Sequence, residues 1–137
     1  MTDKPNENPQ VFIVDDEPVI RDSLHLVVKA MGLSVECFSS AGEFLEFLES
    51  FEGTDPVCLI ADIQMPDVNG IEMLQRLNTM GHQFSTIMIT GHGTAELQKK
   101  AESLGAAAFL EKPFHPEKLQ ENITNCLKLN RAEKETQ

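Results

Sequence analysis

The chain has 137 residues, 41% of them apolar and 24% charged, which is typical of one ordinary globular domain. Acidic residues outnumber basic ones by 22 to 11, and the formal net charge of −11 argues against attraction to nucleic acid or anionic lipid. We therefore expect no direct nucleic-acid binding by this chain. No apolar run approaches the roughly 20 residues of a membrane span, so no membrane association is expected either.

The cysteines and the N-terminal segment favour a reducing compartment inside the cell. Cys37, Cys58 and Cys126 cannot all pair with one another, and their spacing does not resemble the C-x-x-C pairs of a zinc site. The first ten residues, MTDKPNENPQ, contain no apolar segment of a secretory signal. We expect a cytoplasmic, reducing location.

Five short apolar segments follow one another along the chain, and each has the length of a β-strand. They cover residues 11–14, 34–38, 57–61, 86–89 and 107–110. The intervening segments have apolar residues at helical spacing, which predicts amphipathic helices around residues 20–31, 41–48, 71–77, 97–104 and 119–127. Strands and helices are therefore expected to alternate.

Residues typical of helix ends separate these segments. Pro18 falls in a first turn, and Gly32 and Gly105 each follow a last turn. A side-chain oxygen at an N-cap accepts a hydrogen bond from a free backbone N–H group, and this role is expected for Ser39, Asn69 and Thr94.

This alternation predicts an α/β fold with a doubly wound parallel sheet. Strands joined by single helices run parallel, and right-handed crossovers place helices on both faces of the sheet. The apolar runs are continuous, which fits strands buried on both faces. We expect one domain over residues 10–128, a flexible N-terminal arm over 1–9, and a tail or severed linker over 129–137.

Polar residues stand where four of the five predicted strands end. The first strand leads into Asp15 and Asp16, the third into Asp62, the fourth into Thr90 and the fifth into Lys112. Each residue alone has a structural explanation, such as helix capping, a turn or a solvated charge. If the strand order is 2-1-3-4-5, all of them face one crevice at the carboxyl edge of the sheet.

Phosphoryl transfer onto a carboxylate is the chemistry that needs this set of residues. Asp62 is the expected nucleophile, because an aspartate can form an aspartyl phosphate. Asp15 or Asp16, Asp62 and a backbone carbonyl offer the oxygen ligands that Mg²⁺ prefers. Lys112 and the Thr90 hydroxyl would contact phosphoryl oxygens. The chain has no G-x-x-x-x-G-K loop, so a P-loop nucleotide enzyme is not expected.

The segments VFIVDDEPVIRDSL, LIADIQMPDVNGIEML, MITGHG and AAAFLEKPF resemble the receiver domain of bacterial two-component response regulators, over roughly residues 10–128. The resemblance implies a flavodoxin-like sheet of five parallel strands in the order 2-1-3-4-5 with five helices. ITGHG and FLEKPF are further similar to receivers of nitrogen-fixation-type regulators with helix-turn-helix output, whereas TAELQKKAESLG departs from their usual fourth helix.

The resemblance also implies roles for residues around the predicted acidic crevice. Asp62 corresponds to the phosphoacceptor, and Asp15 and Asp16 correspond to the acidic metal pair. The backbone carbonyl of Gln64 would be the third protein ligand of Mg²⁺. Lys112 corresponds to the cation that binds the phosphate.

A second group of residues is implied to transmit or tune the signal. Thr90 corresponds to the hydroxyl switch, and Phe109 either to the aromatic switch or to a core residue. The peptide bond of Lys112–Pro113 is expected to be cis. Gln64 and His92 occupy positions that tune the lifetime of the phosphate, and His92 is less expected to be a metal ligand or phosphohistidine.

The function implied is a two-component switch rather than an enzyme, with at most self-directed phosphotransfer and autodephosphorylation. A sensor histidine kinase or phosphotransfer protein would phosphorylate Asp62, changing a surface of the fourth helix, fifth strand and fifth helix. That surface would control a partner, a homodimer or an attached output domain, with transcription regulation if the output binds DNA. Alternatives are a stand-alone receiver, a phosphate-independent binding module and, least expected, a Mg²⁺-dependent aspartyl-phosphate phosphohydrolase.

Overall fold

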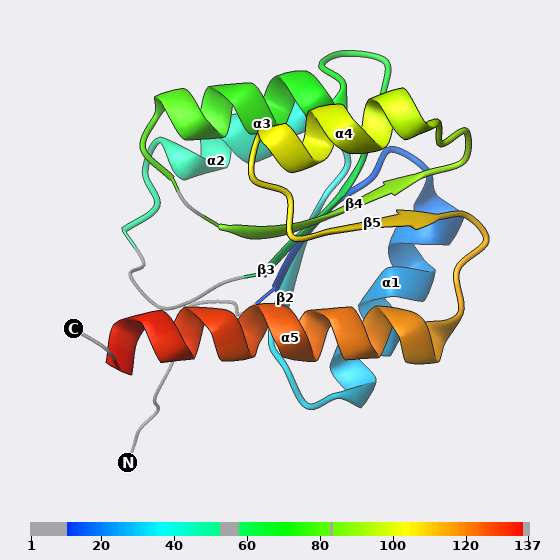
Figure 1. Cartoon of the computed structure of the whole chain (residues 1–137), viewed down its shortest axis with the longest axis vertical. Helices are drawn as coiled ribbons and strands as arrows, with labels where there is room; N and C mark the ends of the chain where they lie inside the picture. The colour runs from blue at the N-terminus through cyan, green and yellow to red at the C-terminus, as the bar shows by residue number, and fades with distance from the viewer. Residues whose placement is uncertain (1–10, 53–57, 83, 136–137) are drawn as a thin grey trace.

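Five parallel strands alternate with five helices in residues 11–52, 58–82 and 84–135, which the computed structural model describes (Figure 1). The strands are β1 (Val11–Val14), β2 (Val35–Phe38), β3 (Cys58–Asp62), β4 (Ser85–Thr90) and β5 (Ala108–Glu111). The helices are α1 (Pro18–Ala30), α2 (Ala41–Leu48), α3 (Gly70–Thr79), α4 (Ala95–Ser103) and α5 (Pro116–Glu135). Val57 of the expected third strand and the expected arm over residues 1–9 lie outside the described residues.

The strands form one sheet in the order β2-β1-β3-β4-β5, and every neighbouring pair is parallel. This confirms the predicted fold. All residues of β1 and β3 are buried, whereas the edge strands β2 and β5 are partly exposed. The continuous apolar runs therefore reflect burial on both faces of the central strands.

Helices cover both faces of the sheet, and each face has its own apolar core (Figure 1). Phe12 and Val14 of β1 belong to the core on the side of α2, α3 and α4. Val11 and Ile13 belong to the core on the side of α1 and α5. Successive side chains of a strand point to opposite faces, so one short strand contributes to both cores.

The core under α2 contains a group of phenylalanine rings around Phe12. Five rings lie with their centroids 5.4–6.0 Å from that of Phe12, and all five pairs are edge-on or tilted: Phe38, Phe44, Phe47, Phe51 and Phe84. Such aromatic pairs each add about 0.5–1.5 kcal/mol beyond their burial. The group fixes α2 and the start of β4 against the centre of the sheet.

The helix ends follow the sequence expectations except at α2. Asn69 and Thr94 are N-caps, and Gly32 and Gly105 have positive φ angles of 79° and 99°. The prediction of Ser39 as an N-cap was wrong, since Ser40 is the residue that accepts from the Glu43 N–H.

The Ser39 N–H and hydroxyl instead donate to the Glu43 carboxylate, at 2.7 and 3.0 Å. The two adjacent serines thus form the two halves of a capping box with Glu43. Ser40 accepts from the Glu43 N–H, and Ser39, one residue before the cap, donates to the Glu43 carboxylate.

The last helix extends further than expected. α5 runs through residue 128, the expected end of the domain, and continues to Glu135. Among the described segments, no helix has both the length and the apolar character needed to cross a membrane, and α5 is charged along its length.

Candidate functional site at the carboxyl edge of the sheet

The predicted site residues meet at one edge of the sheet. Asp15 directly follows β1, Asp62 ends β3, Thr90 ends β4, and Lys112 directly follows β5. Because all strands run parallel, their carboxyl ends lie at the same edge. The site is therefore built at the carboxyl ends of four adjacent strands, β1, β3, β4 and β5.

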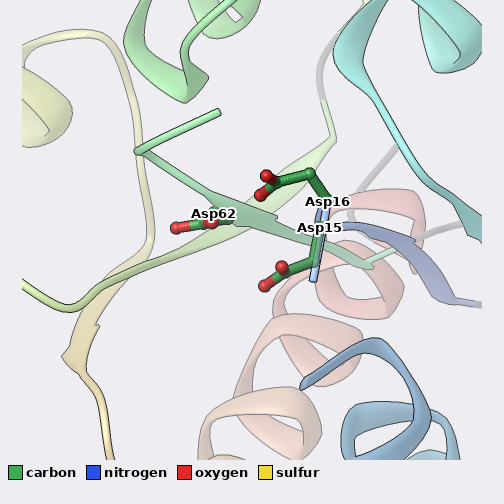
Figure 2. A group of neighbouring side chains, drawn as sticks. All are labelled: Asp15, Asp16 and Asp62. Carbon is green, nitrogen blue, oxygen red and sulfur yellow. The ribbon is translucent and has the colours of Figure 1, made fainter. Parts of the chain in front are cut away.

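Three carboxylates converge in this crevice (Figure 2). Asp15, Asp16 and Asp62 each offer one oxygen, and these oxygens all lie within 4.8 Å of one another. Oδ2 of Asp15 and Oδ1 of Asp16 are buried without a hydrogen-bond donor in the described part of the chain. Such a set of unsatisfied carboxylate oxygens fits a hard divalent cation such as Mg²⁺.

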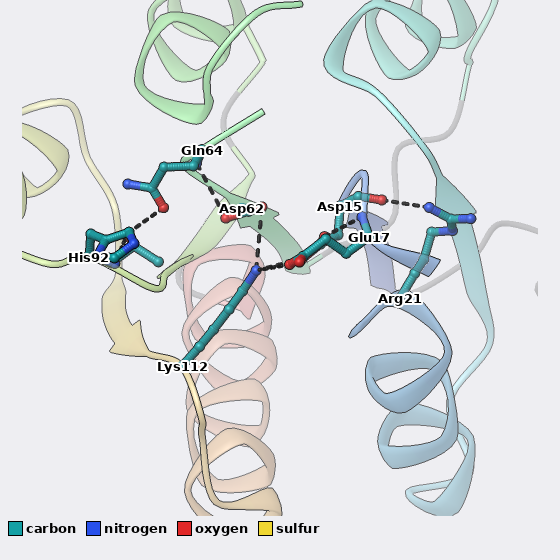
Figure 3. Close-up of polar contacts among 8 residues, drawn as sticks. Asp15, Glu17, Arg21, Asp62, Gln64, His92 and Lys112 are labelled. Carbon is teal, nitrogen blue, oxygen red and sulfur yellow. Dashed lines mark hydrogen bonds and ion pairs between the residues drawn. The ribbon is translucent and has the colours of Figure 1, made fainter. Parts of the chain in front are cut away.

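Lys112 lies against the carboxylates from the side of β5 (Figure 3). Its Nζ atom is 3.4 Å from Oδ2 of Asp62, 3.5 Å from Oδ2 of Asp15 and 3.0 Å from Oε1 of Glu17. Burial favours a lower pKa for Lys112, but the hydrogen bond to Glu17 and the charges of the aspartates outweigh burial and raise its pKa. The Lys112–Pro113 peptide bond is cis, as expected.

Two carboxyl groups of the site have raised pKa values, and burial is the largest cause of both shifts. Burial, and next the charge of Asp15, raise the pKa of Asp62 from 3.8 to about 6. Burial likewise raises the pKa of Asp15, although the Glu17 N–H and Lys112 act in the opposite direction. A single lysine therefore does not compensate the carboxylates, and a further cation would do so.

Thr90 is fully buried, and its hydroxyl makes two hydrogen bonds. Oγ1 of Thr90 donates to Oε1 of Gln64 at 2.6 Å and accepts from the His92 N–H at 3.1 Å. The Gln64 N–H in turn donates to Oδ1 of Asp62 at 3.3 Å. The His92 side chain itself is exposed.

The predicted signalling surface lies beside this site. Phe109 of β5 is partly buried and packs against the core beneath α2, α3 and α4. Four charged residues of the expected switch surface are exposed on α4, β5 and α5: Lys99, Glu102, Glu111 and Lys118. In Figure 1, α4 and α5 lie on opposite faces of the sheet beside β5.

Sequence reasoning missed three residues that shape the site. Glu17 pairs with Lys112, although the run DDE could have suggested a third acidic group. Nη1 of Arg21 donates to the Asp15 carbonyl at 2.7 Å and holds the loop after β1.

Gly70 is the third missed residue, because a Cβ there would lie 2.6 Å from the Asp62 carbonyl oxygen. Glycine is a poor helix former, and its presence in the first turn of α3 was the available signal of close packing.

Comparison with known proteins agrees with this geometry. The family model for the response regulator receiver domain matches residues 11–124. The response regulator protein TodT of Pseudomonas putida is 39% identical over 87% of this chain and 51% of its own length. The transcriptional regulatory protein FixJ of Bradyrhizobium diazoefficiens is 35% identical over 86% of this chain and 56% of its own length.

Two solved structures are also similar along most of their length. A CheY-like receiver domain protein from Methanospirillum hungatei has a TM-score of 0.81 and 32% identity, covering 90% of this chain and 96% of that one. The structure titled FixJ-N has a TM-score of 0.78 and 33% identity, with the same two coverages. This chain spans about half the length of the curated relatives above. The chain belongs to the response regulator receiver domain family.

Proposed function

We propose that Asp62 accepts a phosphoryl group in the presence of Mg²⁺ and that this modification operates the domain as a switch. The observation that carries the proposal is the position of the Asp62 carboxylate, 3% exposed, between the acidic pair and Lys112. A buried carboxylate bordered by metal-binding oxygens and one cation suits an incoming dianionic group better than it suits a structural role.

Asp15, Asp16 and Asp62, with the backbone carbonyl of Gln64, would hold the metal ion. The unsatisfied oxygens of Asp15 and Asp16 support this assignment. The bound cation would neutralise carboxylates and phosphoryl oxygens that otherwise repel one another.

The donor is the phosphohistidine of a sensor histidine kinase or of a phosphotransfer protein. An oxygen of Asp62 forms a bond to phosphorus while the phosphorus–nitrogen bond breaks, and the donor imidazole leaves and takes up a proton. Lys112 and Thr90 hold phosphoryl oxygens. As a signalling domain the chain needs no further substrate, and its chemistry is limited to self-directed phosphotransfer and autodephosphorylation.

The output surface comprises α4, β5 and α5. Thr90 and Phe109 would link it to Asp62, because β4, which carries Thr90, lies between β3, which carries Asp62, and β5, which carries Phe109. Related proteins of which the match covers only 50–56% are named as transcriptional regulators, which supports control of an attached output domain. A homodimer or a separate protein partner would use the same surface. The three free cysteines suit the cytoplasm.

Mass spectrometry of the intact chain tests this function. Incubation with phosphoramidate and Mg²⁺ is expected to add one phosphoryl mass to the native chain and to the control Asp67→Asn. The exposed carboxylate of Asp67 accepts from the Gly42 N–H and lies outside the site. No addition is expected with Asp62→Asn, or with the native chain in excess chelator. Equal labelling of Asp62→Asn and the native chain would contradict the proposal.

A further inference from the structure

The Thr90 hydroxyl donates a hydrogen bond to the side chain of Gln64 when no phosphoryl group is present. Oγ1 of Thr90 donates to Oε1 of Gln64 at an oxygen–oxygen distance of 2.6 Å, and this bond links the loop after β3 to the end of β4. Oγ1 of Thr90 also accepts a hydrogen bond from the His92 N–H at 3.1 Å. Thr90 is fully buried, so water does not compete for this hydrogen.

A threonine hydroxyl has a single hydrogen to donate. If it donates to Gln64, it cannot at the same time donate to a phosphoryl oxygen on Asp62. The two hydrogen bonds are therefore mutually exclusive. The domain has one state in which Thr90 donates to Gln64 and another in which Thr90 donates to the phosphoryl group. This exclusion matters for the function proposed above, on which it rests, because there Thr90 contacts the phosphoryl group.

We propose that Gln64 is a positioning residue that holds the Thr90 hydroxyl in the resting arrangement and must release it when Asp62 is modified. Gln64 suits this role because its backbone and side chain contact the two ends of the switch. Its N–H donates to Oδ1 of Asp62 at 3.3 Å, while its exposed side chain accepts from Thr90.

Breaking the hydrogen bond between Thr90 and Gln64 costs free energy, and this cost lowers the affinity for a phosphoryl mimic. When Thr90 turns away, the exposed Gln64 amide is satisfied by water, but the resting hydrogen bond is lost. A neutral hydrogen bond of this kind changes an equilibrium by roughly two- to tenfold. Gln64 is therefore expected to weaken binding of a phosphoryl mimic by that factor and to keep the unmodified domain in its resting state.

A double-mutant cycle on Gln64 and Thr90 tests this role. Gln64→Met keeps the length of the side chain and its backbone N–H but removes the acceptor. Thr90→Val keeps the shape of the buried residue but removes the hydroxyl. The native chain, both single variants and the double variant are titrated with beryllium trifluoride, a mimic of the phosphoryl group, at saturating Mg²⁺ and followed by NMR.

Gln64→Met is expected to lower the midpoint of this titration by about two- to tenfold. In the Thr90→Val background the same substitution is expected to change the midpoint by less than twofold, because no hydroxyl remains to be held. Without any ligand, the two substitutions are expected to change the unfolding equilibrium non-additively by a similar factor.

Each contrary result has a distinct meaning. Equal midpoints for Gln64→Met and the native chain, or an undiminished effect of Gln64→Met in the Thr90→Val background, would overturn the role of Gln64 while leaving the proposed function intact. Strict additivity in unfolding would also overturn it. If the native chain does not respond to beryllium trifluoride at all, the proposed function fails, and with it the signalling role of Gln64.

Discussion

Asp62 is buried beside Asp15, and its ionisation opposes folding when no cation is bound. Its pKa of about 6 in the folded chain exceeds the ordinary 3.8, so the folded state holds this proton more tightly than the unfolded state. Between pH 4 and 6 the free energy of unfolding contributed by this group therefore falls as pH rises, and above pH 7 the loss is complete. The pKa difference between the folded and unfolded states of Asp62 corresponds to a loss of roughly 1–3 kcal/mol in the free energy of unfolding.

Asp62→Asn is accordingly expected to raise the free energy of unfolding at pH 7.5 in excess chelator, and to have little effect at pH 4. Urea unfolding at both pH values measures this. Asp67→Asn is the control and is expected to lower the free energy of unfolding at pH 7.5. Backbone hydrogen bonds lower the pKa of Asp67, so its ionised form stabilises the fold. A loss of stability at pH 7.5 for Asp62→Asn would show that burial of its charge is not the dominant effect.

Residue types at strand ends were sufficient to predict most of the site. Asp15, Asp62, Thr90 and Lys112 could be found because a parallel sheet brings its carboxyl ends to one edge. The bond from Thr90 to Gln64 spans 26 residues, and the pair of Lys112 with Glu17 spans 95. Such contacts depend on side-chain rotamers and loop packing, which no local sequence pattern specifies.

At the scale of elements, the close approach of α3 to β3 fixes the backbone of Asp62. Gly70→Ala would place a Cβ 2.6 Å from the Asp62 carbonyl oxygen, 2.7 Å from Cε of Met88 and 3.0 Å from Cα of Ile63. The Met88 side chain can move aside, but the two backbone atoms cannot do so without a shift of the strand end. We expect a loss of about 2 kcal/mol or more in the free energy of unfolding. Slower phosphorylation of Asp62 is also expected, since the strand end must shift.

Gly93→Ala is the matched comparison for this substitution. A Cβ at position 93 would also meet a neighbouring atom, but that atom is the flexible carboxylate end of Glu111, which can rotate away. The loss of stability is expected to stay below about 1 kcal/mol. Urea unfolding of both variants checks the contrast, and equal losses would show that backbone crowding at Gly70 is not the cause.

α4 depends strongly on its N-cap because little of it is buried. Ala101 is its only buried residue, and Oγ1 of Thr94 accepts from the Leu97 N–H at 3.0 Å. Thr94→Ala is expected to lower the free energy of unfolding by about 0.5–2 kcal/mol and to speed amide exchange in α4, whereas Thr94→Ser should be close to native. Unchanged exchange in Thr94→Ala would mean that packing alone holds this helix.

The elements were predictable from periodicity, and their ends less so. Continuous apolar runs identified all five strands, with boundaries within one residue of those described, because burial on both faces leaves an unambiguous pattern. The cap of α2 was misassigned by one residue, since Ser39 and Ser40 have the same capping chemistry. Periodicity alone does not determine which strands are neighbours, and the strand order came from the resemblance to receiver domains.

At the scale of the whole molecule, phosphorylation is expected to change a surface away from Asp62. The phosphoryl group adds about −1.5 to −2 charge and draws the Thr90 hydroxyl toward it. To shift the domain from 1% to 99% active molecules, the phosphoryl group must stabilise the active state over the resting state by about 5.5 kcal/mol. A smaller free-energy difference gives a graded response. Amide exchange with and without beryllium trifluoride is expected to change in α4 and β5.

Thr90→Ala is expected to accept the phosphoryl group more slowly and to lose most of this distant change. Its amide exchange on adding the mimic should change only around Asp15, Asp62 and Lys112. If the native chain shows the same restricted response, the proposed surface of α4, β5 and α5 does not carry the signal.

Chemical identification of the modified residue tests the central claim most directly. After incubation with phosphoramidate and Mg²⁺, borohydride reduction converts an aspartyl phosphate to homoserine, and peptide mass spectrometry locates the change. The account predicts homoserine at position 62 and at no other aspartate, with none formed in excess chelator. Homoserine at Asp15 or Asp16, or a phosphoryl group that resists reduction on another side chain, would contradict it.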